Sequence, residues 1–472
     1  MAVEYDLVVV GDTLAGRFAA AAAAQRQARV ALLSQDARCE RDLALQPQTL
    51  LQASHCAQYW EALQGSEGAP SPAASLHWAR ETLTALRERQ GPAVLAAQGI
   101  DCIQGSGRFQ RTPRLALATE RRTLRARRYL VATGSLPSTP PVAGMGQVEA
   151  LTPADLWQPG RLEALPQRVT VVGGTPCGAQ IAQVLARLGH AVSWSSETRL
   201  LPPEEAATAR WVRGRLEAEG VRVLEQAPLT RCERRRNSLT LQAGNRCWET
   251  EAVVLATPAA PNVAGLNLEA AGVSTGAGGI RVDSTLRTRQ PRIYACGSVL
   301  GGYALPNLAQ YEAGIALNNA LFWPPTRADY RRVPWVVPTD PPLARVGLTA
   351  RQARRRYGAK VAVLQQSFAG VASALASGEE AGVCRLIVRR DGTLLGGHIV
   401  GPHAGEAIAP VALALQQNHK IGALASLALT GLGAIEIVQQ TAQQWPAHRL
   451  AQAPRLRGCL DRWFELRRQY AR

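Results

Sequence analysis

The stretch from Tyr5 to Asp36 reads YDLVVVGDTLAGRFAAAAAAQRQARVALLSQD, and the rest of the chain is best understood from it. Its continuous apolar run, Leu7 to Val10, predicts a buried parallel strand. Gly11 ends that run, and Gly16 opens an alanine-rich segment typical of a helix. A second apolar run, Val30 to Leu33, predicts the next strand. The order strand, glycine turn, helix, strand is the unit in which a helix N-terminus faces a pyrophosphate.

The same order of elements recurs at Arg168 to Ser195, RVTVVGGTPCGAQIAQVLARLGHAVSWS. In both units the middle glycine of the G-x-G-x-x-G fingerprint is replaced, by Thr13 in the first and by Thr175 in the second. That glycine lets the backbone approach a pyrophosphate closely, so either turn alone is weak evidence. Two such turns, each after a strand and before a helix, predict an enzyme that binds two nucleotides.

Composition limits the class of protein. The length of 472 residues suggests about three domains, and the 46% of hydrophobic residues is enough for large cores. The sequence has no apolar run of about 18 residues, so we expect no membrane span. It shows no secretory signal, and its nine cysteines are scattered without C-x-x-C spacing. These features predict a cytoplasmic protein with free thiols.

The chain carries a net charge of +17, and Lys360 and Lys420 are its only lysines. Compositional bias spread over solvated faces explains an arginine excess most simply, and a polyanionic or acidic-membrane partner is the alternative. Further along the chain, the pattern predicts helices near Pro47 and over Ser75 to Arg89, and a small antiparallel sheet between Ile100 and Thr123. The sequence from Val333 onward predicts a separate α+β domain.

This order of segments resembles the pyridine nucleotide–disulfide oxidoreductases, the family of dihydrolipoamide dehydrogenase, glutathione reductase and mercuric reductase. The resemblance rests on four segments beyond the two turns: ATGS at Ala132 to Ser135, Pro261 to Val273, Ile280 to Val299, and Val333 to Ala353. The last of these looks like the start of the family's dimerisation domain.

The resemblance implies an α/β fold with two Rossmann-like FAD/NAD(P)-binding domains and a C-terminal α+β dimerisation domain through which a homodimer forms. It places an FAD-binding domain at residues 1–150 and 259–330, an NAD(P)-binding domain at 151–258 and the dimerisation domain at 331–448. Residues 449–472 remain as a basic C-terminal tail.

The cofactors implied are FAD and either NAD or NADP. The resemblance places the FAD contacts in the turns that follow four strands: Gly11, Thr13, Leu14, Ala15, Gly16, Ser34, Thr133, Gly134, Gly297 and Ser298. It places the NAD(P) contacts at Gly173, Thr175 and Gly178.

The acids that the family uses to hold its cofactors are replaced by serines. Ser34 stands where an acid should hold the FAD adenosine ribose, with Asp36 two residues on. Ser298 replaces the aspartate of A-x-G-D, which holds the flavin ribityl chain. Ser196 stands near the NAD-selecting acid, with Glu197 and Arg199 beyond it, so the choice between NADH and NADPH stays open. Hydroxyl groups can still hydrogen-bond ribose and phosphate.

The family's redox disulfide, in G-T-C-x-N-x-G-C-x-P-S-K, has no counterpart in this sequence. Aligning its proline with Pro47 puts Glu40 and Leu45 at the two cysteines and Thr49 at the lysine. Cys39 is one place off and has no partner five residues on. A dithiol relay needs two sulfurs that can close a ring, so we expect no disulfide exchange. Cys39, between Arg38 and Arg41, is either a reactive thiolate or a solvent-facing loop cysteine.

The catalytic signature H-P-T-x-x-E is also altered, because the matching stretch, Gly431 to Glu436, keeps only the glutamate. We expect Glu436 to be an acid at a helix N-terminus and not a catalytic residue. The sequence therefore leaves the catalytic residues unknown. His398 and His403 lie near Glu406, but the family has a similar glycine-rich strand and helix there, and we predict no metal site.

The tail, RLAQAPRLRGCLDRWFELRRQYAR, combines arginines with Trp463, Phe464 and Tyr470. It predicts a basic amphipathic helix that either packs on its own subunit or docks on an acidic protein or membrane surface. Nucleic acid is disfavoured because no binding motif accompanies it.

Two functions therefore compete. One is an FAD-dependent NAD(P)H oxidoreductase that passes electrons to a quinone, a metal ion or oxygen instead of a disulfide. The other is a catalytically inactive dimeric scaffold or nucleotide sensor whose tail is the docking element.

Overall fold

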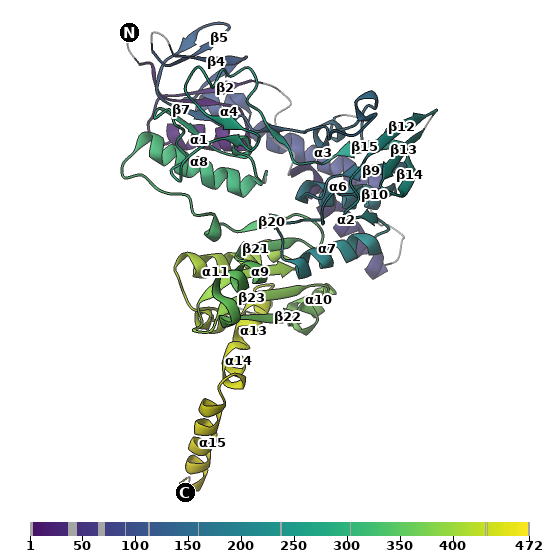
Figure 1. Cartoon of the computed structure of the whole chain (residues 1–472), viewed down its shortest axis with the longest axis vertical. Coiled ribbons are helices and arrows are strands. Elements are labelled where there is room, and N and C mark those ends of the chain that lie inside the picture. Colours follow the sequence, from purple (N-terminus) through teal and green to yellow (C-terminus); the bar gives the residue numbers. More distant parts are fainter. Residues whose placement is uncertain are drawn as a thin grey trace. The chain divides into compact units, whose positions relative to one another are not determined.

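The structure is a computed structural model that describes residues 3–35, 45–64, 71–89, 91–111, 114–158, 160–236, 238–302, 304–429, 431 and 433–470. The chain forms two compact units (Figure 1). The first runs to Pro202 and resumes over Arg215–Asp329, and the second combines Pro203–Gly214 with the chain from Tyr330 onward. The three domain boundaries inferred above stay a prediction.

The first unit contains a five-stranded parallel sheet in the order β19-β7-β1-β2-β3. Its strands are β1 (Tyr5–Val10), β2 (Val30–Ser34), β3 (Asp101–Gln104), β7 (Ala126–Val131) and β19 (Ile293–Ala295). One face, with Leu7 and Val9, packs against the helices α1 (Leu14–Ala24) and α8 (Pro306–Leu321). The small alanine side chains of α1, such as Ala19 and Ala20, are fully buried there. The strand–helix–strand pattern predicted from Tyr5 onward is therefore confirmed.

The opposite face of this sheet presents Val8 and Val10 to Phe109 and Leu117. These two residues lie in a three-stranded antiparallel sheet made of β4 (Gly107–Gln110), β5 (Ala116–Thr119) and β6 (Thr123–Leu124). The prediction of an antiparallel sheet from Ile100 was wrong for its first strand. β3 joins the parallel sheet, because the short helix α4 (Pro92–Ala97) carries the chain back beside β2.

A second parallel sheet, in the order β11-β10-β9-β15, follows in the same unit. It consists of β9 (Arg168–Val172), β10 (Ala191–Ser195), β11 (Arg222–Leu224) and β15 (Ala252–Leu255), with α6 (Pro176–Arg187) after β9. A three-stranded antiparallel sheet adjoins it: β12 (Arg231–Arg235), β13 (Ser238–Ala243) and β14 (Arg246–Thr250).

The helices α2 (Leu45–Gln64) and α3 (Pro72–Arg89) pack against each other. Arg187 of α6 donates to the Ser54 hydroxyl of α2 at 3.1 Å.

The second unit is built on a five-stranded antiparallel sheet, β20-β21-β24-β23-β22. Its strands are β20 (Trp335–Val337), β21 (Leu343–Gly347), β22 (Val361–Ser367), β23 (Val383–Arg389) and β24 (Leu394–Val400). The helices that follow this sheet's strands, up to the tail, are α9 (Ala350–Tyr357), α10 (Ala372–Ser377), α11 (Ala404–Gln416), α12 (Ile421–Ala425), α13 (Glu436–Gln443) and α14 (Trp445–Ala451). Phe368, Val411 and Ile437 are fully buried in its core. The α+β domain predicted from Val333 is therefore confirmed.

Shorter elements connect these sheets: α5 (Pro153–Leu156), β8 (Ser135–Leu136), β16 (Ala260–Pro261), β17 (Thr275–Gly276) and β18 (Gly279–Ile280). The helix α7 (Ala206–Ala218) begins in the second unit and ends in the first. Within the described ranges, every helix is too short or too polar to cross a membrane.

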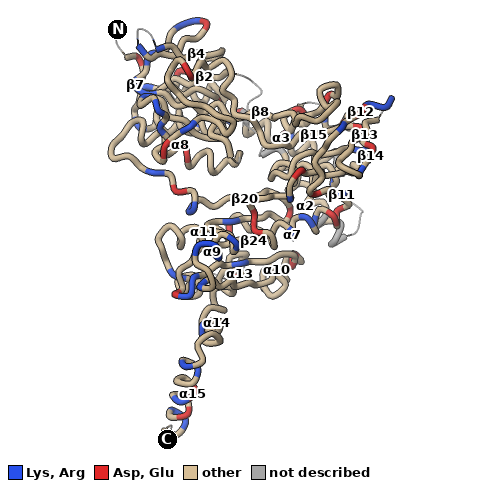
Figure 2. The backbone as a smooth tube through the Cα atoms, viewed as in Figure 1, with Lys and Arg blue, Asp and Glu red and all other residues tan. Residues whose placement is uncertain are grey.

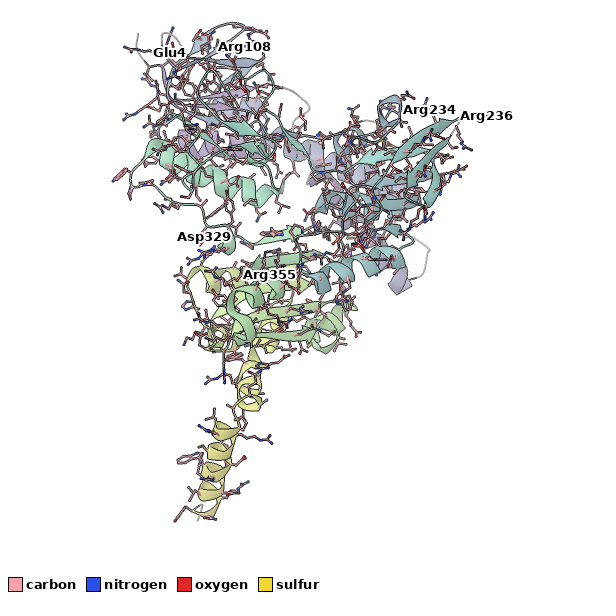
Figure 3. The ribbon with its side chains drawn as sticks, in the orientation of Figure 1. Glu4, Arg108, Arg234, Arg236, Asp329 and Arg355 are labelled. Carbon is pink, nitrogen blue, oxygen red and sulfur yellow. The ribbon has the colours of Figure 1, made fainter. Side chains whose placement is uncertain are left out.

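The tail forms a helix, α15 (Pro454–Gln469), and none of its residues is buried. The alternative in which this helix packs on its own subunit is therefore wrong for the single chain. Basic residues are scattered over both units (Figure 2). Arg108 on β4, Arg234 near the end of β12 and Arg236 in the turn that follows β12 project into solvent (Figure 3).

Candidate cofactor site

The residues singled out for FAD gather at one edge of the first parallel sheet. The strands β1, β7 and β19 end at Val10, Val131 and Ala295, and β2 ends at Ser34. Because parallel strands place their carboxyl ends at the same edge, the turns that follow them meet there. These turns hold the whole predicted set: Gly11 to Gly16, Ser34, Thr133 and Gly134, and Gly297 and Ser298. Their contact with a cofactor stays a prediction.

Two glycines bring the helix α1 close to this edge. Gly11 has a φ of +113°, and a Cβ added to it would lie 2.3 Å from the carbonyl oxygen of Ala132. A Cβ on Gly16 would lie 2.0 Å from the carbonyl oxygen of Gly11. Both positions therefore require glycine. The turn retains the close packing of strand and helix that a dinucleotide-binding unit needs.

Thr13, which replaces the middle glycine, caps the helix. It has a φ of −83°, which any residue adopts, and it is 6% exposed. Its hydroxyl donates to the Ala132 carbonyl at 2.8 Å and accepts from the Gly16 N–H at 3.2 Å. The side chain therefore turns inward. The N–H groups of Leu14 and Ala15, at the first two helical positions, have no acceptor within the helix itself.

Thr175 repeats this arrangement in the second nucleotide-binding segment, which belongs to the same compact unit. Its hydroxyl donates to the Ala256 carbonyl at 2.7 Å and accepts from the Gly178 N–H at 3.1 Å. The two nucleotide-binding segments, which share only a sequence pattern, thus make the same pair of hydrogen bonds. The loss of the middle glycine is in both cases a capping substitution.

Gly297 and Ser298 border the N-terminus of α1. Gly297 has a φ of +80°, and a Cβ on it would lie 3.4 Å from the Ala15 Cβ. Its N–H donates to the Glu312 carboxylate of α8 at 2.7 Å. Ser298 is 9% exposed and starts a short 3-10 helix, η2 (Ser298–Leu300). Burial, and then the charge of Glu312, raise the pKa of the Cys296 thiol well above its ordinary value, so this thiol stays protonated.

Asp12, which is not among the residues predicted from the sequence, supplies a carboxylate at this edge. Asp12 is 5% exposed and accepts from Arg17 Nη2 at 3.0 Å and from the Ser34 hydroxyl at 3.2 Å. A carboxylate is expected at the end of β2, where Ser34 stands. The structure instead has one on Asp12, in the glycine turn after β1, and Ser34 donates a hydrogen bond to it. The available signal was an acid inside the glycine turn, Gly11-Asp12-Thr13. Asp36 lies outside the described residues.

At the second turn, Gly173 has a φ of +127° and a Cβ on it would lie 2.2 Å from the Ala256 carbonyl oxygen. The buried Trp194 indole donates to the Gly173 carbonyl at 2.8 Å and so stabilises the turn. Ser196, near the position of the NAD-selecting acid, is 3% exposed, and a Cβ on Gly174 would lie 2.4 Å from its hydroxyl oxygen. Ser196 therefore packs against the turn.

None of the positions expected for redox chemistry is among the turn residues of the cofactor edge. Cys39 and Glu40 lie outside the described residues, while Thr49 lies on α2, where Cys56 is an exposed free thiol. Glu436 is the first residue of α13, and its carboxylate accepts from the Gln440 side chain at 2.9 Å. That position agrees with an acid at a helix N-terminus.

The two histidines considered as metal ligands lie in different surroundings. His398 is fully buried in β24, and its Nε2 lies 3.2 Å from the Leu348 carbonyl oxygen. Burial, and then the charge of Arg345, lower the pKa of His398 from 6.5 to about 3, so this imidazole is neutral. His403 is exposed and pairs with Glu406 at 3.5 Å.

The residues at the sheet edge fit an FAD molecule. Gly11 and Gly16 give the close approach, the Thr13 hydroxyl is turned toward the Ala132 carbonyl, and Asp12 offers a carboxylate beside β2. Residues 5–313 of the chain match the pyridine nucleotide-disulphide oxidoreductases. The chain belongs to this family. Residues 333–430 match its dimerisation domain, which supports a homodimer. Members of the family are flavoprotein oxidoreductases that use FAD and NAD(P)H.

Relatives within the family include several mercuric reductases. The chain is 30% identical to the mercuric reductase of Staphylococcus aureus over 429 residues, covering 88% of this chain and 77% of that protein. It is 30% identical to the mercuric reductase of Streptomyces lividans, covering 93% of this chain and 96% of that protein. It is 29% identical to the dihydrolipoyl dehydrogenase of Bacillus subtilis, covering 86% and 91%.

The fold is also that of a solved structure, the Cu(II) complex of the HOCl-induced flavoprotein disulfide reductase RclA from Escherichia coli. The TM-score is 0.82 at 23% identity, and the match covers 94% of this chain and 99% of that one. The predicted α/β class, with its two nucleotide-binding units and a dimerisation domain, is thereby confirmed.

Proposed function

We propose that this chain is an FAD-dependent NAD(P)H oxidoreductase that passes electrons to an acceptor other than a disulfide. The observation that carries the proposal is the contrast between the two parts of the site. The cofactor edge has kept the first and last glycines of its turn, Gly11 and Gly16, and its helix N-terminus, and it has a carboxylate at Asp12. The redox segment has Leu45 and Thr49 where the family has a cysteine and a lysine.

In this proposal the residues at the sheet edge bind and orient the flavin. The N–H groups at the start of α1 and the hydroxyl of Ser298 bind its phosphates and ribityl chain, and Asp12 accepts from its adenosine ribose. Bound FAD would supply the hydride-accepting and electron-donating chemistry. Gly173, Thr175 and Gly178 would hold the pyrophosphate of NAD(P)H at α6.

The acceptor is a small oxidant that takes electrons from a flavin directly: a quinone, a metal ion or oxygen. A disulfide substrate needs a thiolate to attack one of its sulfurs. Among the described cysteines, Cys232, Cys296 and Cys384 are buried, and the exposed Cys56, Cys247 and Cys459 lie on α2, β14 and α15, away from the turns of the cofactor edge in sequence. Burial raises the pKa of Cys384 to about 12, so it is not a nucleophile at neutral pH.

The first test is the visible spectrum of the purified protein. We expect flavin bands that bleach anaerobically on addition of NADH or NADPH, and the comparison of the two coenzymes also settles the preference. A colourless protein that takes up no added FAD would support the scaffold or nucleotide sensor instead.

The second test compares acceptors. We expect NAD(P)H-dependent reduction of a quinone, a metal ion or oxygen, and no reduction of oxidised glutathione, lipoamide or a cysteine-peptide disulfide. The variants Cys39→Ser and Cys56→Ser should keep the activity. Reduction of a disulfide substrate that either substitution abolishes would overturn the proposal, because a thiol relay would then exist.

A further inference from the structure

The helix α15 exposes an apolar face to solvent. Its large apolar side chains are about half exposed: Leu456 at 44%, Trp463 at 56%, Phe464 at 50% and Leu466 at 49%. The preceding helix, α14, is held to the second unit by Trp445, which is 8% exposed. Figure 1 shows α15 extending from α14, away from the sheet of that unit. The apolar face is therefore offered to a partner outside the chain.

The apolar residues lie on one side of the helix. Leu456, Leu460, Trp463 and Phe464 follow the spacing i, i+4, i+7, i+8, which places them on one face. Leu466, Tyr470 and Cys459 extend this face, so that at 3.6 residues per turn it covers an arc of about 160°.

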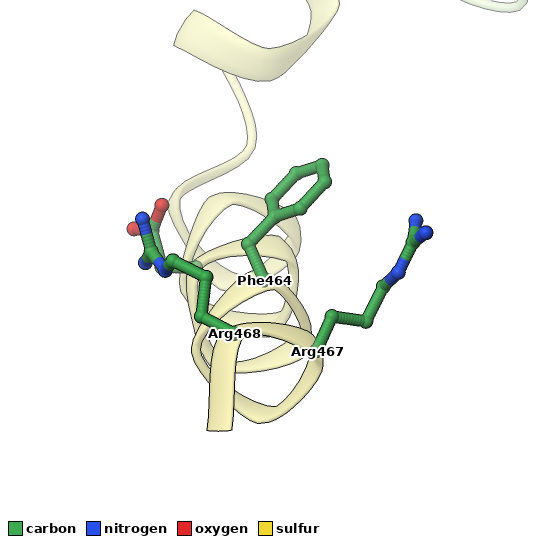
Figure 4. Close-up of a pocket in the computed structure, with 4 residues that line it drawn as sticks. Phe464, Arg467 and Arg468 are labelled. Atoms are coloured by element: carbon green, nitrogen blue, oxygen red, sulfur yellow. The ribbon is translucent and has the colours of Figure 1, made fainter. Parts of the chain in front are cut away.

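Four arginines border this face, a fifth, Arg467, falls near its middle in the last turn of the helix, and the two acids lie on the opposite side. Arg455 and Arg462 fall along one border, and Arg457 and Arg468 along the other, when the helix is drawn at 3.6 residues per turn. Asp461 and Glu465 fall on the polar side. Figure 4 looks along α15 and shows the Phe464 ring pointing between Arg467 and Arg468, whose guanidinium groups extend to opposite sides. Together with Asp461, these three residues line a shallow hollow on the helix surface.

We propose that α15 lies flat on an anionic lipid bilayer. An interfacial helix buries its Trp, Phe and Leu side chains at the boundary between headgroups and acyl chains, while arginines at the borders of its apolar face reach the headgroup phosphates. The borders of the apolar face of α15 meet both conditions, and the two carboxylates fall on the polar side. Arg467, within the face, lies in the last turn, where its long side chain can extend past the end of the apolar face to the headgroups. The net charge of +17 draws the whole protein toward the same surface.

The arginines also argue against a second copy of α15 as the occupant. Two such helices that paired through their apolar faces would bring bordering side chains of one into contact with those of the other. Because arginine borders both sides of the face, these contacts would be repulsive, whereas paired helices favour opposite charges at those positions.

The experiment is co-sedimentation of the full-length protein with vesicles of equal parts phosphatidylcholine and phosphatidylglycerol, compared with pure phosphatidylcholine. We expect binding to the anionic vesicles that weakens as salt is raised, and little binding to the neutral ones. The triple variant Arg457→Gln, Arg462→Gln, Arg468→Gln should lose on the order of 100-fold in affinity, at about 1 kcal/mol per arginine. The double variant Trp463→Ser, Phe464→Ser should also lose binding, because the apolar contact is removed.

A matched control separates α15 from the overall charge. Arg351, Arg354 and Arg355 are exposed arginines of another helix, α9, and have no acidic partner among the described residues. Replacing all three by glutamine should weaken vesicle binding far less than the α15 triple variant does. Flavin content and oligomeric state, measured for every variant, show that each has folded.

Three outcomes would overturn the proposal. The first is equal vesicle binding by the full chain and a chain without residues 454–472. The second is equal weakening by the α15 and α9 triple variants, which would make binding a matter of net charge alone. The third is binding of α15 to an acidic polypeptide such as polyglutamate, or to a second copy of the chain, without binding to the anionic vesicles.

Discussion

At the scale of single residues, the most informative position is Asp12. The family's ribose-binding acid at the end of the second strand is missing here, yet Asp12 places a buried carboxylate 3.2 Å from the serine that replaced it. The Arg17 guanidinium donates to this carboxylate at 3.0 Å and balances its charge. A cofactor hydroxyl can therefore enter an existing network of hydrogen bonds instead of creating one.

We predict that Asp12→Asn lowers FAD affinity by about tenfold to a hundredfold, because hydrogen bonds to a charged acceptor contribute roughly 1.5–3 kcal/mol. The measurement is the dissociation constant of FAD for the deflavinated protein, followed by flavin fluorescence. Asp283→Asn is a control on the surface of the same unit, where Asp283 binds the Thr285 backbone N–H at 2.8 Å. Unchanged affinity in Asp12→Asn would exclude Asp12 from the ribose site.

Glycine positions allow a second prediction at this scale. Gly16→Ala would force a Cβ to 2.0 Å from the Gly11 carbonyl oxygen, so the turn must open, and we expect loss of bound flavin. Gly314→Ala in α8 is the control. Its Cβ would meet Phe18 at an ordinary 3.9 Å, and in a helix the change should stabilise the fold by up to about 1 kcal/mol. Flavin content and thermal unfolding of the two variants are the measurements, and equal flavin content would contradict the prediction.

At the scale of elements, the sheet of the second unit carries a buried ionic cluster. The Glu205 carboxylate accepts from the Ala350 N–H at the start of α9 at 2.8 Å and lies 3.9 Å from Arg385. Arg345 lies 3.8 Å from Glu204, and its guanidinium stacks 4.0 Å above the Trp335 ring. These contacts join residues 203–205, which precede α7, to β21, β23 and α9.

We predict that Glu205→Ala lowers the free energy of unfolding by about 3 kcal/mol, because it leaves a helix N-terminus and a partly buried arginine without their acceptor. Glu406→Ala removes an exposed partner of His403 in the same unit and should cost less than about 0.5 kcal/mol. Chemical denaturation of both variants measures the difference. Similar midpoints would mean that the cluster contributes little to stability.

The same sheet buries His398, which gives a pH prediction. The folded pKa is about 3 and the ordinary value is 6.5, so the unfolded chain binds a proton that the folded chain excludes. Its contribution to stability is thus fully present above pH 6.5 and is lost as the pH falls toward 3, at about 1.4 kcal/mol per pH unit. The charges of Arg345 and Arg385 act in the same direction.

The measurement is the free energy of unfolding between neutral and mildly acidic pH. His398→Gln should show a shallower loss of stability than the parent protein, whatever its stability at neutral pH. Parallel pH profiles for the two proteins would contradict the prediction.

At the scale of the whole molecule, the matched dimerisation domain at residues 333–430 supports a homodimer, and α15 lies outside this range. We predict that a chain without residues 454–472 remains a dimer in analytical ultracentrifugation while losing vesicle binding. A truncated chain that sediments as a monomer would place α15 in the subunit interface.

The sequence by itself determined the fold class, because the first strand of each nucleotide-binding segment is a mostly apolar run followed by a glycine. Leu7 to Val10 before Gly11, and Val169 to Val172 before Gly173, are readable without any long-range contact. It also determined which residues stand at the turns. The tertiary structure decided how those residues act. The inward hydrogen bonds of Thr13 and Thr175 end on carbonyls of Ala132 and Ala256, far along the chain.

Only the tertiary structure placed Asp12 beside Ser34, joined β3 to the parallel sheet and left α15 uncovered. The physical reason is the same in each case. Periodicity reports which side of an element avoids water, but not which distant element, carboxylate or solvent meets that side.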